Sequence, residues 1–261
     1  MTWNDHWKVN HEKKTVKLLG DSLETRSERM DQILSAEREK GTFKVLKKWT
    51  KELFPIYGPG HELILKLERA AAGLFGIVTY GVELIIYRED PDGLKLWAAR
   101  RSAKKVLYPN ALGVTVGGSL PFGESPFECM VRETHEEAGL SENLVRKHAI
   151  SVGTINYATC SESKTTSGGE SGLIRAEVQF LYEMKVGADV IPAPHDMEAS
   201  DISLYTIDEI KKALADGEFT PANACFFLDF FIRHGLITYE NEENYTKIVS
   251  CLHRPLRMQT A

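Results

Sequence analysis

The stretch of sequence that decides the fold is GSLPFGESPFECMVRETHEEAGL, which runs from Gly118 to Leu140. Its second half predicts a helix over 126–138. Ser125 is a favourable N-cap with a proline directly after it, and Glu128 completes a capping box with Ser125. Gly139 is typical of the residue that ends a helix. Local chemistry therefore defines both ends of this helix.

The two faces of the predicted helix differ in character. Successive residues are about 100° apart around a helix, and one stripe consists of Phe127, Val131, Thr134 and Ala138. A second stripe, away from the first, carries three acidic residues: Glu133, Glu136 and Glu137. Carboxylates at this spacing repel one another. Their grouping makes physical sense beside a hard divalent cation, so we expect a Mg²⁺ or Mn²⁺ site.

The same residues resemble the Nudix box, in which a glycine, a glutamate and an Arg-Glu…Glu-Glu…Gly helix occur at fixed spacing. Every fixed position of that motif is present between Gly118 and Gly139. The one departure is Thr134, which occupies a position that is usually apolar. The resemblance implies an α/β/α sandwich with a mixed sheet, and a hydrolase that acts on phosphoric anhydride bonds.

The resemblance also implies roles for individual residues. Glu133, Glu136 and Glu137 match the metal ligands, and whether one of them is also the general base, and which one, stays open. The carbonyl of Gly118 matches a backbone ligand. Arg132 matches the arginine that orients the carboxylates, and Glu124 matches its supporting glutamate. Members of the family often add a carboxylate from outside the box, for which Glu177 and Glu198 are the candidates.

Flanking sequence is similar to one branch of that family, related to the Nudix part of fungal thiamine pyrophosphokinases. The similarity lies in the segments 68–77, 97–102, 108–109 and 252–256. It implies cleavage of thiamine diphosphate, or of a damaged analogue, to the monophosphate and phosphate. The chain departs from the branch at Gly113 and Val114, where an Asp/Asn pair is usual, and in the polar loop 158–173. A prenyl or nucleoside diphosphate derivative is therefore the alternative substrate.

Two further functions share this fold. One is a module that binds a diphosphate without cleaving it, and the other is an isomerase of prenyl diphosphates. An intact box disfavours the first, and the cysteine surroundings typical of the second are not evident before the box. For the substrate, Arg69, Arg101 and Lys104 are candidate phosphate ligands, and Tyr80, Tyr108 and Tyr157 could flank an organic ring. Arg100 and Arg101 would point to opposite faces of a strand, so at most one points inward.

Apolar runs and turn residues give the rest of the architecture. We expect strands at 63–67, 75–87, 95–99, 114–116, 150–157 and 176–184. We expect further helices at 26–39, 49–53, 207–215, 222–234 and 242–252. The segment 160–172 is predicted to be a mobile loop. The resulting division is a helical N-terminal extension (1–61), a Nudix domain (62–215) and a C-terminal helical segment (216–261) that packs on it.

Composition limits the remaining function classes. A net charge of −5 gives no reason to expect nucleic acid or a membrane as a partner. No apolar run suits a signal peptide or a membrane span. The four cysteines lie far apart, which favours free thiols. We therefore expect a cytoplasmic enzyme of small-molecule diphosphates; its oligomeric state, monomer or homodimer, stays open.

Overall fold

The computed structural model describes residues 5–256, 258 and 260, apart from 106–107 and 163–168. Its centre is a mixed sheet of seven strands in the order β11-β6-β5-β10-β9, with β7 paired to β6 and β8 paired to β5. These strands are β5 (Val78–Asp90), β6 (Gly93–Arg101), β7 (Leu112–Gly113), β8 (Val116–Ser119), β9 (Ala149–Cys160), β10 (Ile174–Lys185) and β11 (Ala199–Thr206). The β5–β10 pair is parallel, and the other pairs of this sheet are antiparallel.

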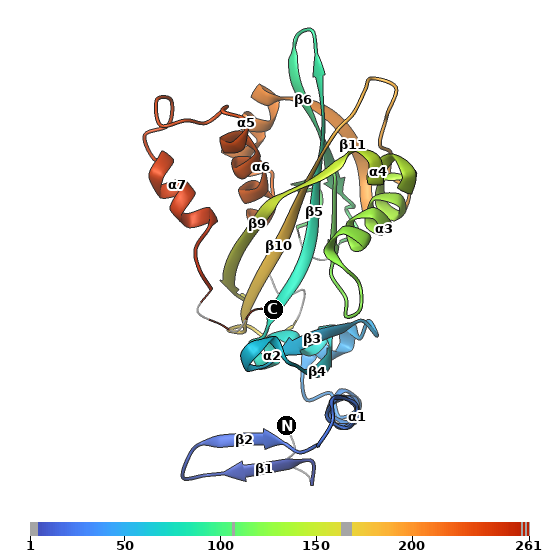
Figure 1. Cartoon of the computed structure of the whole chain (residues 1–261), viewed down its shortest axis with the longest axis vertical. Coiled ribbons are helices and arrows are strands. Elements are labelled where there is room, and N and C mark those ends of the chain that lie inside the picture. Colours follow the sequence, from blue (N-terminus) through green and yellow to red (C-terminus); the bar gives the residue numbers. More distant parts are fainter. Residues whose placement is uncertain (1–4, 106–107, 163–168, 257, 259, 261) are drawn as a thin grey trace.

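Helices cover both faces of the sheet, as Figure 1 shows. One face packs against α3 (Pro126–Ala138) and α4 (Glu142–His148), and the other against α5 (Ile207–Ala215), α6 (Pro221–Arg233) and α7 (Tyr245–Leu252). Alternate residues of β5 enter the two cores: Leu84 and Ile86 face α3, while Ile85 faces α6. This period of two is the property of a strand buried on both faces. The expected three-layer sandwich is confirmed.

The C-terminal helices belong to the second core. Four aromatic side chains of α6 are almost completely buried there: Phe226, Phe227, Phe230 and Phe231. Next to them, the carboxylate of Glu183 accepts a hydrogen bond from Arg233 and contacts His234, which fixes α6 to β10. Helix α6 therefore packs on the central sheet, and the division of the chain at 215/216 stays a prediction.

The N-terminal region is only partly helical. It contains α1 (Leu23–Glu39), the short helices η1 (Lys44–Lys48), η2 (Pro59–His61), η3 (Arg69–Ala71) and α2 (Ala72–Phe75), and two hairpins formed by β1 (Trp7–Asn10) with β2 (Thr15–Leu18) and β3 (Leu53–Tyr57) with β4 (Leu63–Glu68). Helix α1 agrees with the sequence. The helix predicted at 49–53 is wrong: Lys51 has a positive φ, and Leu53 already pairs with Glu68.

A separate small core supports this region. It contains Met30, Leu34, Leu46, Leu65 and Leu67, all buried. The strand predicted at 63–67 exists as β4, but it pairs with β3 and not with the central sheet. The β3–β4 hairpin thus spans the boundary proposed at 61/62, and that division of the chain stays a prediction. Residues 163–168 of the proposed loop 160–172 lie outside the described residues.

Candidate active site

The acidic residues lie on α3, whose ends are set by the local contacts expected from the sequence. The Ser125 hydroxyl accepts a hydrogen bond from the Glu128 N–H at 3.3 Å, and Gly139 ends the helix with φ 67°. Only one of the two hydrogen bonds of the predicted capping box forms, the one that Ser125 accepts. The Glu128 carboxylate turns instead to Arg146 of α4, accepting two hydrogen bonds of 2.7 Å each. This pair ties α4 to the first turn of α3.

The buried stripe of α3 is also as expected, because Val131, Thr134 and Ala138 have almost no exposed surface. The Thr134 hydroxyl donates to the Met130 carbonyl at 2.7 Å. A hydroxyl buried without a partner would be costly, and this internal bond removes that cost. The polar residue at this position is therefore compatible with a packed helix.

Arg132 holds three carboxylates of the motif in place around α3. It donates two hydrogen bonds to Glu124, at 3.0 and 2.8 Å, and pairs with Glu133 at 3.0 Å and with Glu136 at 2.9 Å. The guanidinium lowers the pKa of Glu124 through these hydrogen bonds. A planar fork with several donors suits this task, since it fixes the orientation of each carboxylate.

Glu137 lies deeper than its neighbours on the helix. Its carboxylate accepts a hydrogen bond of 3.1 Å from the backbone N–H of Gly117, at the start of β8. Burial raises the pKa of Glu137 to about 8, and the charges of Glu133 and Glu198 act in the same direction. Burial likewise raises the pKa of Glu133. Removal from water thus disfavours both negative charges, a cost that a cation would offset.

Two glycines of β8 leave room for carboxylate side chains of the site. A Cβ atom on Gly118 would lie 2.3 Å from Cδ of Glu133, and one on Gly117 would lie 2.4 Å from Oε2 of Glu83. No side chain fits at such distances. Glycine at 118 therefore leaves the space that the Glu133 side chain occupies.

The carboxylates have the chemistry of a magnesium site, although they are not gathered around one point. Among the residues that the structure describes, no three His, Cys, Asp or Glu side chains form a ready-made cation cluster. Glu133 and Glu136 form ion pairs with Arg132, and Glu137 accepts a hydrogen bond from the Gly117 N–H. The donors are nevertheless oxygens on one helix face, two of them desolvated, which is the ligand type that Mg²⁺ and Mn²⁺ take. The residues present therefore fit a hard divalent cation.

Glu83 is a site residue that the sequence analysis missed. It lies on β5 directly opposite Gly117. Burial raises the pKa of Glu83 well above its ordinary value, the charges of Glu137 and Glu177 add to this effect, and Arg101 opposes it. The sequence did carry a signal: one acidic residue stands inside an otherwise apolar run, 82–86. A buried charge of this kind is unusual in a strand without a functional reason.

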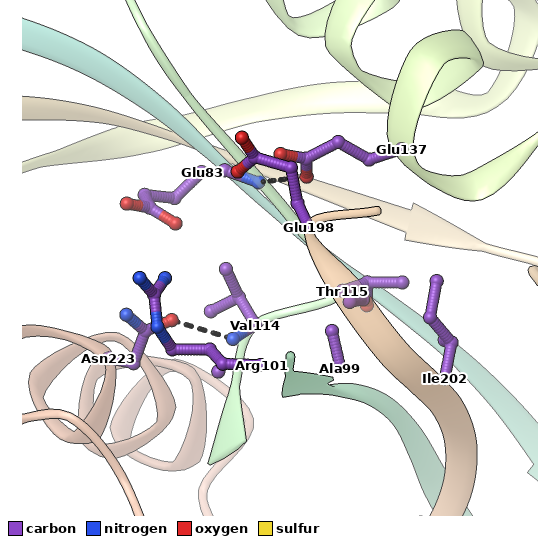
Figure 2. Close-up of a pocket in the computed structure, with 12 residues that line it drawn as sticks. Glu83, Ala99, Arg101, Val114, Thr115, Glu137, Glu198, Ile202 and Asn223 are labelled. Carbon is purple, nitrogen blue, oxygen red and sulfur yellow. Dashed lines mark hydrogen bonds between the residues drawn. The ribbon is translucent and has the colours of Figure 1, made fainter. Parts of the chain in front are cut away.

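Two adjoining cavities meet at these residues. The larger has a volume of about 770 Å³ and lies between the central sheet, α3 and the N-terminal region. The smaller, of about 120 Å³, lies behind it and is lined by Ala99, Gly113 and Ile202, among others. Both are lined by Glu83, Arg101, Gly117, Glu137, Glu198 and Asn223. Figure 2 shows Glu83, Glu137 and Glu198 on one side of the smaller cavity, with Arg101 and Asn223 on the other.

The structure separates the predicted substrate residues into two groups. Arg69, Arg101, Tyr80 and Tyr157 line the larger cavity, with Tyr80 largely buried against Phe180. Lys104 and Tyr108 are exposed and line neither cavity. Lys105 takes the place of Lys104, because it lines the larger cavity and pairs with Glu198 at 2.7 Å.

The neighbouring arginines of β6 point in opposite directions, as the strand period requires. Arg101 lines both cavities. Arg100 instead donates to the Asn110 carbonyl at 2.8 Å and pairs with Glu218 at 3.2 Å. The prediction that at most one of the two points inward is therefore confirmed.

The two outlying carboxylates have different surroundings. Glu177 accepts a 2.6 Å hydrogen bond from the Tyr157 hydroxyl and is also bonded by Gln179 and Arg175. Glu198 is more exposed, and its charge raises the pKa of both Glu133 and Glu137. Glu198 is thus electrostatically coupled to the acidic face of α3, whereas Glu177 is coupled to Glu83.

Asn223 is the second site residue that the sequence analysis missed. It lies in the first turn of α6, where its side-chain oxygen accepts a 2.7 Å hydrogen bond from the Val114 N–H. A Cβ atom on Gly113 would lie 3.0 Å from that same oxygen. The sequence showed only a helix start after Pro221, so nothing local indicated this contact across 109 positions.

Comparison with known proteins identifies the family. The model of the NUDIX domain matches residues 79–225, which include β5, the whole box and the start of α6. The chain belongs to the Nudix family. Membership supports an enzyme that hydrolyses pyrophosphate bonds, and members of the family generally use divalent metals. The preceding residues, 2–79, match a domain of unknown function, DUF4743.

Several relatives share more than the Nudix domain. An uncharacterized protein of Saccharomyces cerevisiae is 31% identical over 262 residues, which cover 99% of this chain and 76% of the yeast protein. Nudix hydrolase 20, chloroplastic, of Arabidopsis thaliana is 29% identical over 87% of this chain and 58% of the plant protein. A crystal structure from Deinococcus radiodurans has 23% identity and a TM-score of 0.44, covering 65% of this chain and 92% of its own.

Two simpler predictions can also be compared with the structure. In the part of the chain that the structure describes, none of the helices has the length and apolar character needed to cross a membrane. The four cysteines are free, with Cys129 buried at the base of α3. The compartment of the protein stays a prediction.

Proposed function

We propose that this Nudix enzyme hydrolyses the diphosphate of a small organic molecule, with thiamine diphosphate or a damaged analogue as its best substrate. The observation that supports the proposal most is the position of α3. It presents Glu133, Glu136 and Glu137 to a cavity of about 770 Å³, within the size range of small-molecule sites. The flanking segments that resemble the thiamine branch support the choice of substrate.

Mg²⁺ or Mn²⁺ would be held by the three glutamates of α3 and the Gly118 carbonyl. Glu198 is the better candidate for an additional ligand, because its charge acts on Glu133 and Glu137. The cation would neutralise phosphate charge and activate water. Arg132 pairs with Glu133 and Glu136 and would orient these two carboxylates beside the cation.

The other side chains have separable tasks in this proposal. Arg101 and Lys105 line the cavity beside the acidic face and would bind phosphate oxygens. One glutamate of the box would take the proton of the attacking water as the new P–O bond forms. The bridging P–O bond then breaks, and the products are a monophosphate and phosphate. General-base help of this kind contributes roughly 10²–10⁴ in rate.

A panel of substrates tests the proposal. Phosphate release with Mg²⁺ would be measured for thiamine diphosphate, oxidised thiamine diphosphate, ADP-ribose and geranyl diphosphate. We expect the highest kcat/KM with one of the two thiamine compounds. A clear preference for ADP-ribose or geranyl diphosphate would remove the thiamine assignment but leave the hydrolase. Binding without phosphate release, or conversion to an isomer, would contradict hydrolysis itself.

A further inference from the structure

The N-terminal region forms one wall of the larger cavity. Its residues that line the cavity come from η1, β3, η3, α2 and the segments between them: Val45, Lys48, Thr50, Glu52, Phe54, Arg69, Ala70, Ala72, Gly73 and Ile77. They lie across the cavity from the acidic face of α3. Figure 1 shows β3, β4 and α2 at the end of the central sheet where β5 begins. A ligand bound at α3 would therefore meet both parts of the chain.

The N-terminal region is also attached to the two loops beside the site. At the loop before α3, the Phe122 N–H donates to the Leu53 carbonyl at 2.7 Å, and the Lys66 ammonium lies 4.3 Å from the centre of the Phe122 ring. At the loop between β9 and β10, the Glu170 carboxylate accepts from the N–H groups of Lys44 and Val45, the latter at 3.0 Å. Contacts at both loops hold the wall in position.

A buried carboxylate shapes the wall from within. Glu68, which is 3% exposed, accepts hydrogen bonds from the N–H groups of Thr50, Lys51 and Ala70 and from the Thr50 hydroxyl, at 3.0–3.2 Å. Buried charges are retained when they are satisfied in this way. Glu68 joins the segment before β3 to η3, and both carry cavity residues. No step of the hydrolysis uses it, so its task is to fix the surface of the wall.

The chemistry of the wall indicates what it could bind. Its small apolar residues, Ala70, Ala72 and Gly73, line the same cavity as Tyr157 and Glu177. Charged groups lie at its edge: Arg69 pairs with Glu52 at 2.9 Å, Arg175 pairs with Glu177 at 3.3 Å, and Lys48 lines the same cavity. The presence of these charges disfavours a long hydrocarbon chain. A flat ring with polar edges suits both the apolar surface and its polar rim.

We propose that the N-terminal region is the substrate-recognition part of the enzyme, and that its wall binds a ring-bearing organic group whose diphosphate lies at α3. The inference rests on the proposed hydrolase activity. It assigns a role to the region that matches the domain of unknown function DUF4743. The wall would act on the organic group alone. Substrates that lack a ring should then be insensitive to changes in the wall.

The test compares two substrates in three proteins. Ala70→Leu fills part of the wall without touching the backbone bond to Glu68, and Ala188→Leu makes the same change in the exposed turn after β10. Each protein would be assayed with methyl diphosphate and with the best substrate of the panel above. We expect Ala70→Leu to lower kcat/KM for the ring-bearing substrate about tenfold or more, with methyl diphosphate changed less than about twofold. Ala188→Leu should match the wild type.

Each outcome has a separate meaning. An equal loss with both substrates, or no loss with either, would overturn the recognition role while the hydrolase stands. A wild-type enzyme that cleaves neither substrate would instead remove the proposed function. Hydrolysis of methyl diphosphate shows that the variant is folded. If Ala70→Leu fails to fold, Gly73→Ala replaces it, because a Cβ atom there meets Leu173 at an ordinary contact distance of 3.4 Å. It should raise KM for the ring-bearing substrate only, and unchanged values for both substrates would contradict the inference.

Discussion

The backbone of Gly118 lies directly against the side chain of Glu133: a Cβ atom at position 118 would stand 2.3 Å from Cδ and 2.4 Å from Cγ of the glutamate. The contact joins β8 to the middle of α3, so the strand sets how far the acidic face lies from the sheet. The same holds one residue earlier, where Gly117 lies against Glu83 and donates to Glu137. Two successive glycines thereby position three carboxylates of the site.

The first prediction is that Gly118→Ala impairs catalysis. The new methyl group must displace Glu133, because its Cβ and the carboxylate cannot share the space. We expect kcat to fall on the order of tenfold to a hundredfold, since misplacing a catalytic group by about 1 Å can cost that much. Gly187→Ala is the control, because only the flexible end of Asp189 would have to move there. A Gly118→Ala enzyme with normal kcat would show that the position of Glu133 is not critical.

The second prediction concerns the metal. Turnover should stop when EDTA removes divalent cations and should return when Mg²⁺ or Mn²⁺ is added. Folding should survive, because α3 has its own N-cap, its own C-cap and a buried apolar stripe. Circular dichroism before and after chelation would follow the fold while phosphate release follows activity. Undiminished turnover after exhaustive chelation would refute the metal-assisted mechanism.

The parts of this site that the sequence could predict are those that local chemistry determines. The helix 126–138 is correct to the residue because Ser125 and Gly139 lie next to its ends. Strands β5, β6, β9 and β10 were found from apolar runs, with shifts of a few residues at their ends.

The parts that it missed depend on distant partners. The segment before β3 contains good helix formers, yet Glu68 holds Thr50 and Lys51 in another conformation. Strand β11 is an edge strand, and the alternation of polar and apolar residues from Asp201 to Leu204 was a signal that the sequence analysis did not use. Strands β1 and β2 contain no fully buried residue and pair with each other. Glu83 and Asn223 join the site because β8 pairs with β5 and because α6 packs on the sheet.

The third prediction uses the burial of Glu137. Its pKa is raised to about 8 in the folded protein, above the value near 4.3 of an unfolded chain. The folded state therefore binds the proton of the Glu137 carboxyl group more tightly than the unfolded state does. The protonated Glu137 contributes its full stability below about pH 4, and this contribution is lost as the pH rises to about 8. In EDTA, the melting temperature should fall more steeply from pH 5 to pH 8 for the wild type than for Glu137→Gln.

The same variant tests the catalytic role. Glu137→Gln keeps the shape of the side chain but removes its negative charge, so we expect turnover to fall about 10²-fold or more. Glu128→Gln, on the same helix but paired with Arg146, is the matched control and should retain its turnover. Melting temperatures of the wild type and Glu137→Gln that fall in parallel with pH would contradict the raised pKa. Near-normal turnover of Glu137→Gln would contradict the catalytic role.

The fourth prediction compares the neighbouring arginines of β6. Arg101→Gln should raise KM for a diphosphate substrate by about tenfold or more, because a hydrogen bond to a charged group contributes roughly 1.5–3 kcal/mol. Arg100→Gln should leave KM unchanged, since Arg100 binds Asn110 and Glu218 outside the cavities. Steady-state kinetics of both variants would give the two KM values. A larger increase in KM for Arg100→Gln than for Arg101→Gln would contradict the orientations described for the two side chains.

The fifth prediction concerns substrate preference at Gly113. This residue lines the smaller cavity and precedes the box, and a Cβ atom there meets Asn223 and the Ala99 carbonyl and no atom of α3 within 4 Å among its three nearest neighbours. A Cβ atom would lie 3.0 Å from the Asn223 oxygen that accepts from Val114, and Gly113→Leu would therefore both fill the cavity and press on the start of α6. We expect the ranking of thiamine diphosphate, ADP-ribose and geranyl diphosphate by kcat/KM to change.

The metal dependence should not change with it. The Mg²⁺ concentration that gives half-maximal activity should stay within about twofold of the wild type, because a Cβ atom at position 113 lies nearest to Asn223 and Ala99 and not to a proposed oxygen ligand. Gly113→Ala is the graded control: its single methyl group needs the Asn223 side chain to move by only a few tenths of an ångström. It should shift the ranking less than Gly113→Leu. If both variants lose all substrates equally and need more Mg²⁺, Gly113 supports the metal site, and the smaller cavity does not select the substrate.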